Sequence, residues 1–167
     1  DLPLDWIDAG AEAEIGWLVD LVTEVRSIRA EMNVPPGARV PLTLSGASAE
    51  TLDRLERHGD LLQTLARLSS ATAGEAPAGS APFTIGEATA AIAIADFIDL
   101  AAERARLTKE IAGHVGDIER VNKKLGNPDF LAKAKEEVIE ENREKLAEAE
   151  AAKAKLEAAL GRLASVA

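Results

Sequence analysis

The sequence predicts an α+β fold, mainly α, with an N-terminal helix, a small β-α-β-β unit and a long antiparallel helical hairpin. Three observations predict it. Apolar residues recur at helical spacing over residues 11–32 and over most of the last third of the chain. Alternating apolar residues near position 90 indicate strands. The run Gly-Asn-Pro at positions 126–128 separates two long helical patterns, which must therefore fold back on each other.

The first predicted element is a helix over residues 11–32. Continuing its apolar stripe at about 100° per residue places Arg26 and Arg29 on the same face, which therefore becomes cationic in the last turns. The run Pro35-Pro36-Gly37 ends the helix. The stripe consists of Ile15, Leu18, Val19, Val22 and Val25. Two tryptophans, Trp6 and Trp17, are expected to be packing anchors.

A small β-α-β-β unit is predicted next. Residues 39–44 form a short strand, and Pro41 suggests that it lies at the edge of its sheet. Residues 48–68 form a helix with leucines at helical spacing, and residues 71–82, rich in Ala, Gly, Pro and Ser, form a surface loop. Residues 83–94 form a β-hairpin, because Ile92 and Ile94 share one face of a strand that follows a Gly-Glu turn.

The hairpin of helices covers residues 97–125 and 130–163. Gly126 suits a left-handed position that ends the first helix. Asn127 is a good N-cap, and Pro128 fits the first turn of the next helix because its missing N–H costs nothing there. At about 1.5 Å per residue, each helix is roughly 40 Å long or more. Such an arm is longer than a small core requires, so we expect it to reach a partner.

A coiled-coil seam is predicted between these two helices. One heptad column of the first helix includes His114, and the second helix presents Asn142 opposite it. We interpret His114 as an interface histidine. A single Asn in such a seam can set the register of the two helices.

Composition excludes several classes of site. The 167 residues carry 19 Lys and Arg against 29 Asp and Glu, a net charge of −10 that argues against an extended nucleic-acid surface. Without cysteine, disulfides and thiolate metal sites are excluded, and two histidines exclude a histidine-rich metal site. No stretch approaches the ~20 apolar residues of a membrane span. We find no catalytic residues, no metal ligands and no cofactor site in these residues. Since the first residue is Asp and no signal peptide follows, the chain looks like a piece of a longer, cytoplasmic protein.

Two sets of cations are candidate binding residues. One set flanks the hairpin turn and should meet at its far tip: Arg120, Lys123, Lys124, Lys133 and Lys135. These may contact phosphate in an otherwise acidic protein, or may be solvated charge on an exposed hairpin. The other set, Arg26 and Arg29, may pair with carboxylates such as Glu24, Glu31 or a residue of a domain outside this chain, or may face a nucleic-acid backbone.

Several motifs resemble one family. The runs EIGWL at residues 14–18 and RSIRAEMNVPPG at residues 26–37 resemble the end of the anticodon-binding region of bacterial valyl-tRNA synthetases. The runs DFIDL at 96–100, ERARLTKE at 103–110 and KKLGNPDF at 123–130 resemble the C-terminal coiled-coil arm of that family. The resemblance extends over nearly the whole chain in the same order.

The resemblance implies that residues 1–37 end the helical anticodon-binding domain, residues 38–96 form a small linker unit and residues 97–167 form a tRNA-binding arm. The parent would be a cytoplasmic valine–tRNA ligase that uses ATP and Mg, with its catalytic and editing domains upstream. The fragment would not be active alone. In this family the arm packs against the outer corner of tRNA, so the implied partners are tRNA(Val) and the remaining domains. One departure is Lys135, where the family has Pro; it should make the start of the second arm helix smoother.

A different class of function stays open at this point. An antiparallel hairpin with an exposed Leu/Ala stripe could be a coiled-coil protein–protein interaction module, docking another helix or self-associating. The tRNA-binding interpretation requires only a monomer.

Overall fold

The computed structural model describes residues 8–166, which divide into two units. Unit 1 holds residues 8–100 and 162–166, and unit 2 holds residues 101–161. The described chain is mainly helical with one four-stranded sheet, which confirms the predicted α+β, mainly α class. The predicted division of roles at residues 37 and 96 stays a prediction.

Helix α1 (Ala9–Glu31) begins at Asp8, whose carboxylate accepts a hydrogen bond from the backbone N–H of Gly10 at 3.0 Å. Trp17 is buried, as predicted, whereas Trp6 lies outside the described residues. The predicted apolar stripe is wrong at its start, because Ile15 and Val19 are 61% and 57% exposed. The helix carries apolar residues on more than one side, so spacing alone does not identify the covered side. The buried side consists of Trp17, Leu21, Val22, Val25, Ile28 and Arg29.

The sheet of unit 1 has the strand order β2-β1-β4-β3. Strand β1 (Val40–Ser45) pairs in parallel with β2 (Leu68–Ala73) and antiparallel with β4 (Ala88–Ala93). The predicted hairpin is confirmed as β3 (Ser80–Ile85) and β4. The prediction of a surface loop over residues 71–82 is wrong at both ends, where β2 and β3 lie, and so the unit has four strands rather than three.

The predicted edge position of the first strand is also wrong, because β1 lies between β2 and β4. Pro41 is accommodated by two features. The register with β2 shifts between Val40 and Pro41, and the pairing with β4 begins only at Leu42. A proline that donates no hydrogen bond can therefore lie at this irregular end of an inner strand.

Helix α2 (Ala49–Ala66) crosses over between the parallel strands β1 and β2. The hydroxyl of Ser48 caps it by accepting from the N–H of Thr51 at 3.2 Å. Helix α1 contacts both α2 and β3, and α2 packs on β2. The two helices thus bury a shared core with the sheet, formed by Leu21, Ile28, Leu42, Leu44, Leu62, Leu68 and Ile92.

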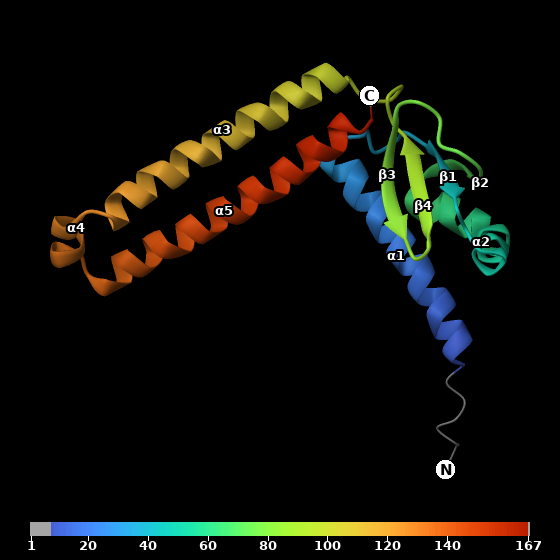
Figure 1. The fold of residues 1–167 in the computed structure, drawn as a ribbon, viewed down its shortest axis with the longest axis horizontal. Coiled ribbons are helices and arrows are strands. Elements are labelled where there is room, and N and C mark those ends of the chain that lie inside the picture. The colour runs from blue at the N-terminus through green and yellow to red at the C-terminus, as the bar shows by residue number, and fades with distance from the viewer. Residues whose placement is uncertain (1–7, 167) are drawn as a thin grey trace, which may run out of the picture. The chain divides into compact units, whose positions relative to one another are not determined.

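Unit 2 is a hairpin of two long helices with a short one at its end (Figure 1). Helices α3 (Leu100–Leu125) and α5 (Glu136–Ala164) run antiparallel, and α4 (Pro128–Lys133) lies at the turn. The prediction of one continuous second helix is wrong, since α4 ends at Lys133 and its C-cap, Ala134, is extended with φ −75° and ψ 145°. The start of the second helix is therefore not smoothed by Lys135.

The turn itself confirms one predicted cap and corrects another. Asn127 caps α4 by accepting from the N–H of Asp129 at 3.0 Å, and Pro128 lies in the first turn. Gly126, however, is not among the described residues with positive φ, and its N–H still bonds the carbonyl of Asn122 at 2.8 Å. The reversal is made by the extended backbone of Asn127, so no left-handed glycine is required.

The predicted seam is only partly buried. Leu107 and Ala159 are each 1% exposed, but the middle of α3 is half-buried at His114, Ile118 and Val121. Asn142 is buried and donates to the carbonyl of Val138 in its own helix at 2.8 Å. Among residues 8–166, this bond within α5 is the hydrogen bond found for its side chain, and none is found across the seam.

Candidate nucleic-acid interface

The five predicted tip cations lie on the three elements that build the end of the hairpin. Helix α3 carries Arg120, Lys123 and Lys124 in its last two turns, Lys133 is the last residue of α4, and Lys135 immediately precedes α5. All five side chains are exposed. The structure therefore brings these residues to one end of unit 2, as the sequence predicted.

The lysines of this tip are not engaged by carboxylates. Arg120 pairs with Asp117 one turn earlier. Among residues 8–166, no ion pair involves Lys123, Lys124, Lys133 or Lys135. Lys123 and Lys124 lie in the last turn of α3, where the negative end of the helix dipole stabilises a positive charge. This interaction does not hold the side chains in one orientation. Four ammonium groups stay available to an anion.

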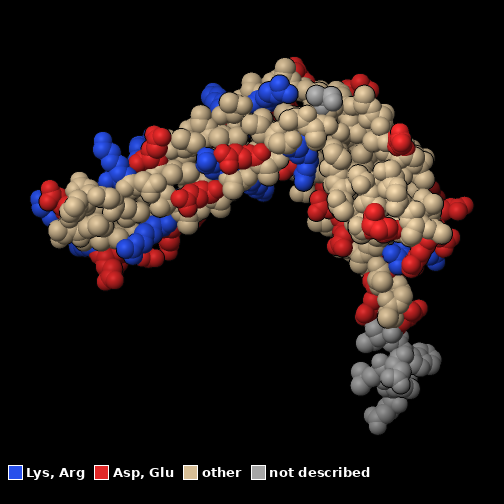
Figure 2. All heavy atoms as spheres, viewed as in Figure 1, with Lys and Arg blue, Asp and Glu red and all other residues tan. Residues whose placement is uncertain are grey.

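The surrounding surface is mixed in charge. Figure 2 shows Lys and Arg side chains projecting from the end of the hairpin, with acidic side chains between them and along the arm. A shallow depression beside Lys135 is lined by Glu136, Glu137 and Glu140. On the face that Figure 2 shows, the cations of the tip are thus interspersed with acidic side chains.

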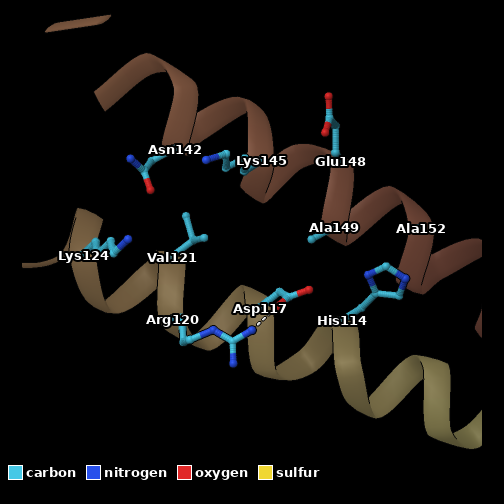
Figure 3. A pocket seen from close by; sticks show the side chains of 10 residues that line it. All are labelled: His114, Asp117, Arg120, Val121, Lys124, Asn142, Lys145, Glu148, Ala149 and Ala152. Carbon is cyan, nitrogen blue, oxygen red and sulfur yellow. Dashed lines mark hydrogen bonds and ion pairs between the residues drawn. The ribbon is translucent and has the colours of Figure 1, made fainter. Parts of the chain in front are cut away.

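A groove of about 470 Å³ lies between α3 and α5 behind the tip (Figure 3). His114 points across it towards α5 near Ala152, whereas Asn142 faces the end nearer Lys124. The predicted opposition of His114 and Asn142 is therefore wrong. Lys145 of α5 also lines the groove, a cation that the sequence analysis did not select because it lies among acidic residues.

The other two predicted residues, Arg26 and Arg29, lie in unit 1, at the end of α1. The Nε of Arg26 donates to the carbonyl of Leu65 at 3.1 Å. Arg29 is 7% exposed and donates to three carbonyls, those of Arg67 at 3.3 Å, Pro35 at 3.1 Å and Ala38 at 2.6 Å. Arg29 thus ties the end of α1 to the segment that leads into β1 and to the end of α2.

Neither Glu24 nor Glu31 pairs with these arginines in the described residues, and a carboxylate partner outside this chain stays a prediction. Glu31 pairs instead with Arg162, at 2.7 Å, and no ion pair in the described part of the chain includes Glu24. Burial, and then the neighbouring charge of Arg67, lowers the pKa of Arg29 below its ordinary value. An arginine stays charged under such conditions, so the guanidinium is a buried cation held by neutral acceptors.

Arg67 was missed by sequence analysis. It follows the last turn of α2 in a left-handed conformation with φ 53°, and its Nη1 donates to the carbonyl of Pro36 at 2.5 Å. A pocket of about 230 Å³ is lined by Arg26, Arg29, Leu65, Ala66 and Arg67. Nothing in the spacing of the sequence links residue 67 to residues 26 and 29.

Other classes of site are not seen in the described residues. Within residues 8–166, no group of three or more His, Asp or Glu side chains is placed to hold a metal ion. None of the helices in the same range combines the length and apolarity of a membrane span.

The hairpin also matches a known family. Residues 99–164 match the family described as the valyl tRNA synthetase tRNA binding arm. In this segment the chain is similar to that family. The resemblance seen in the sequence is thereby confirmed, and the match reaches back to Asp99 at the start of the arm.

Relatives are similar over nearly the whole chain. A valine–tRNA ligase of Caulobacter vibrioides is 73% identical over 99% of this chain and 18% of its own length. Valine–tRNA ligases of Bradyrhizobium diazoefficiens and Nitrobacter winogradskyi are 51% and 47% identical, over 95% and 93% of this chain and 17% and 16% of their own lengths. The chain therefore spans less than a fifth of the length of the curated relatives it matches.

Proposed function

We propose that this chain is the tRNA-binding C-terminal region of a valine–tRNA ligase, and that the hairpin tip contacts the phosphate backbone of tRNA(Val). The observation that carries the proposal is the set of four exposed lysines without carboxylate partners at the end of the hairpin, in a segment that matches the tRNA-binding-arm family. A few phosphate contacts together with the shape of a folded RNA would suffice for such binding.

The finer proposal concerns where the arm acts. Because α3 and α5 have 26 and 29 residues, roughly 40 Å each at about 1.5 Å per residue, the arm would hold the outer corner of the tRNA while the remaining domains attach valine with ATP and Mg. Such a contact adds affinity and orients the substrate, and carries little base-specific readout. The fragment would act as a monomer in the cytoplasm and would not be active alone.

The test is charge reversal at the tip. Lys123→Glu with Lys124→Glu should weaken tRNA binding about tenfold or more at low salt and should lower the salt slope of log K by up to about 2, because two phosphate contacts are lost. The matched control is Lys109→Glu with Lys155→Glu, which makes the same change in net charge on exposed lysines of the same hairpin away from its tip. Titrations with intact tRNA and with an anticodon stem-loop across salt locate the contact.

Two results decide the proposal. Salt-sensitive binding to intact tRNA alone, weakened by the tip variant and not by the control, supports contact of the tip with the tRNA corner. Equal affinity of the tip variant and the control at low salt would refute it. In the whole ligase, valine activation without tRNA should keep its rate in the tip variant.

A protein–protein interaction module is the second candidate. The observation that favours it is the exposure of apolar side chains at the same tip, where Leu131 and Val138 are 40% and 39% exposed. Sedimentation over a range of concentrations distinguishes the two, because self-association through this surface would give a mass that rises with concentration.

A further inference from the structure

Three guanidinium groups converge where α1 and α2 both end. Arg26 and Arg29 come from the last turns of α1, and Arg67 follows the last turn of α2. All three line the same pocket of about 230 Å³, together with Leu65 and Ala66. All these residues belong to unit 1.

The cluster has no balancing carboxylate. Throughout residues 8–166, every acceptor that these three arginines engage is a backbone carbonyl. The negative ends of the two helix dipoles, at about −0.5 elementary charge each, offset roughly one of the three positive charges. An excess of about two positive charges remains beside a guanidinium that is 7% exposed. Arg26 and Arg67 are exposed, so water screens much of their repulsion, and a bound anion would lower what remains beside the buried Arg29.

The three side chains also keep donors for such an anion. Arg26 uses only its Nε, so both of its terminal nitrogens are available, and Arg67 uses only Nη1. Arg29 directs both terminal nitrogens to backbone carbonyls, one of them the carbonyl of Arg67. It therefore contributes positive charge and helps to position Arg67, rather than offering hydrogen bonds to the anion. A guanidinium with two parallel N–H groups fits the oxygens of a phosphate.

The backbone at Arg67 supports a site rather than an accidental cluster. Residue 67 adopts φ 53° and ψ 56°, a conformation in which glycine or asparagine is the usual residue. Its carbonyl accepts from Arg29 and from the N–H of Val40, interactions that any residue could provide. The side chain uses one terminal nitrogen to hold the carbonyl of Pro36, and its remaining donors are free at the pocket that Arg26 also lines.

We infer that the pocket formed by Arg26, Arg29 and Arg67 binds a phosphodiester group of RNA, as a second contact that is independent of the hairpin tip. The inference rests on the proposed function, since tRNA is the polyanion that this region would meet. RNA is favoured over a protein carboxylate because the excess of positive charge also attracts the phosphates that flank the bound one.

The experiment uses the whole 167-residue chain and two variants. Arg67→Gly removes the guanidinium and its bond to Pro36 but suits the positive φ and keeps the backbone carbonyl, so its unfolding midpoint should change little. Arg26→Gln removes the second set of free donors. The matched control is Arg57→Gln, an exposed arginine of the same unit that pairs with Glu14 and Asp53.

Each pocket variant should bind tRNA about tenfold more weakly than the control at low salt, with a salt slope lower by about 1. Inorganic phosphate, compared with chloride at matched ionic strength, should raise the unfolding midpoint of the parent chain and of Arg57→Gln but not of Arg67→Gly.

The tRNA affinities of the pocket variants and the tip variant distinguish failure of this inference from failure of the proposed function. If Arg26→Gln and Arg67→Gly bind tRNA like the control while the Lys123/Lys124 reversal binds weakly, the tip contact stands and the pocket is not a phosphate site. The same conclusion follows if the pocket variants lower stability without changing tRNA binding, which would mark the arginines as partners of helix carbonyls or of a carboxylate elsewhere in the ligase.

Discussion

Replacing Arg29 with Met should destabilise unit 1 by about 3 kcal/mol. Arg29 is 7% exposed and donates to the carbonyls of Arg67, Pro35 and Ala38. Hydrogen bonds from a charged group contribute about 1.5–3 kcal/mol each, so the three together set an upper bound of roughly 5–9 kcal/mol. Methionine retains most of the apolar stem, so the loss of packing is small.

Two effects reduce that bound. The carbonyl of Arg67 keeps a partner in Val40 N–H, and water can reach the exposed Pro35. The charge also costs free energy to bury, as the lowered pKa of Arg29 indicates, and methionine removes that cost. About half of the bound therefore remains, which is a large fraction of the stability of a small domain.

Urea unfolding followed by tryptophan fluorescence measures this change, because Trp17 is buried in the same helix. Arg29→Lys is the informative companion, since an ammonium group can replace one of the three bonds but not all of them. It should lie between the parent and Arg29→Met. A loss below about 1 kcal/mol for Arg29→Met with an unchanged m value would refute the reasoning, because water would then satisfy the three carbonyls equally well.

Three further changes test local features of unit 1. Hydrogen bonds from the hydroxyl of Thr51, and then from Ser48, lower the pKa of Glu87 from 4.5 to about 2. The ionised Glu87 carboxylate therefore contributes its full stabilisation above pH 4.5 and loses it as the pH falls towards 2. Glu87→Gln should remove that dependence from the unfolding midpoint measured against pH, and an unchanged acid limb would contradict it. Gly79→Ala should cost about 2–4 kcal/mol in urea unfolding, because φ is +81° and the new Cβ would lie 2.5 Å from that of Ala95. Gly59→Ala, inside α2 with nothing within 4 Å, should instead stabilise by about 0.5–1 kcal/mol, and a loss would show that the space at this site is not open.

The helices and the β-hairpin could be predicted because their signals are local. Asn127 and Pro128 mark the start of α4 whatever surrounds them. Strand β2 could not be predicted, because its sequence of small and polar residues gains strand structure only by pairing with β1. The break at Ala134 likewise lies in a run of good helix formers, where tertiary geometry at the turn prevails over propensity.

The candidate sites divide in the same way. The tip lysines could be found because a hairpin necessarily brings the ends of its helices together. The surroundings of Arg29 could not be predicted, because its hydrogen-bond partners are backbone carbonyls of a loop and of the end of another helix. Arg67 joins that cluster only through the parallel crossover from β1 to β2, which no spacing in the sequence specifies.

The return of residues 162–166 to unit 1 has a consequence for the order of folding during synthesis. Leu163 and Val166 are each 1% exposed, and Arg162 pairs with Glu31 across 131 positions of sequence. These contacts cannot form until the ribosome has made the entire arm. A separation of this size would ordinarily make loop closure entropically costly. The hairpin shortens the search, because α3 and α5 form from nearby residues and bring position 162 back towards position 100 before the distant pairing occurs. Unit 1 is thus completed late in folding. Its last contacts depend on prior formation of the helical hairpin, which contributes few residues to the core of unit 1.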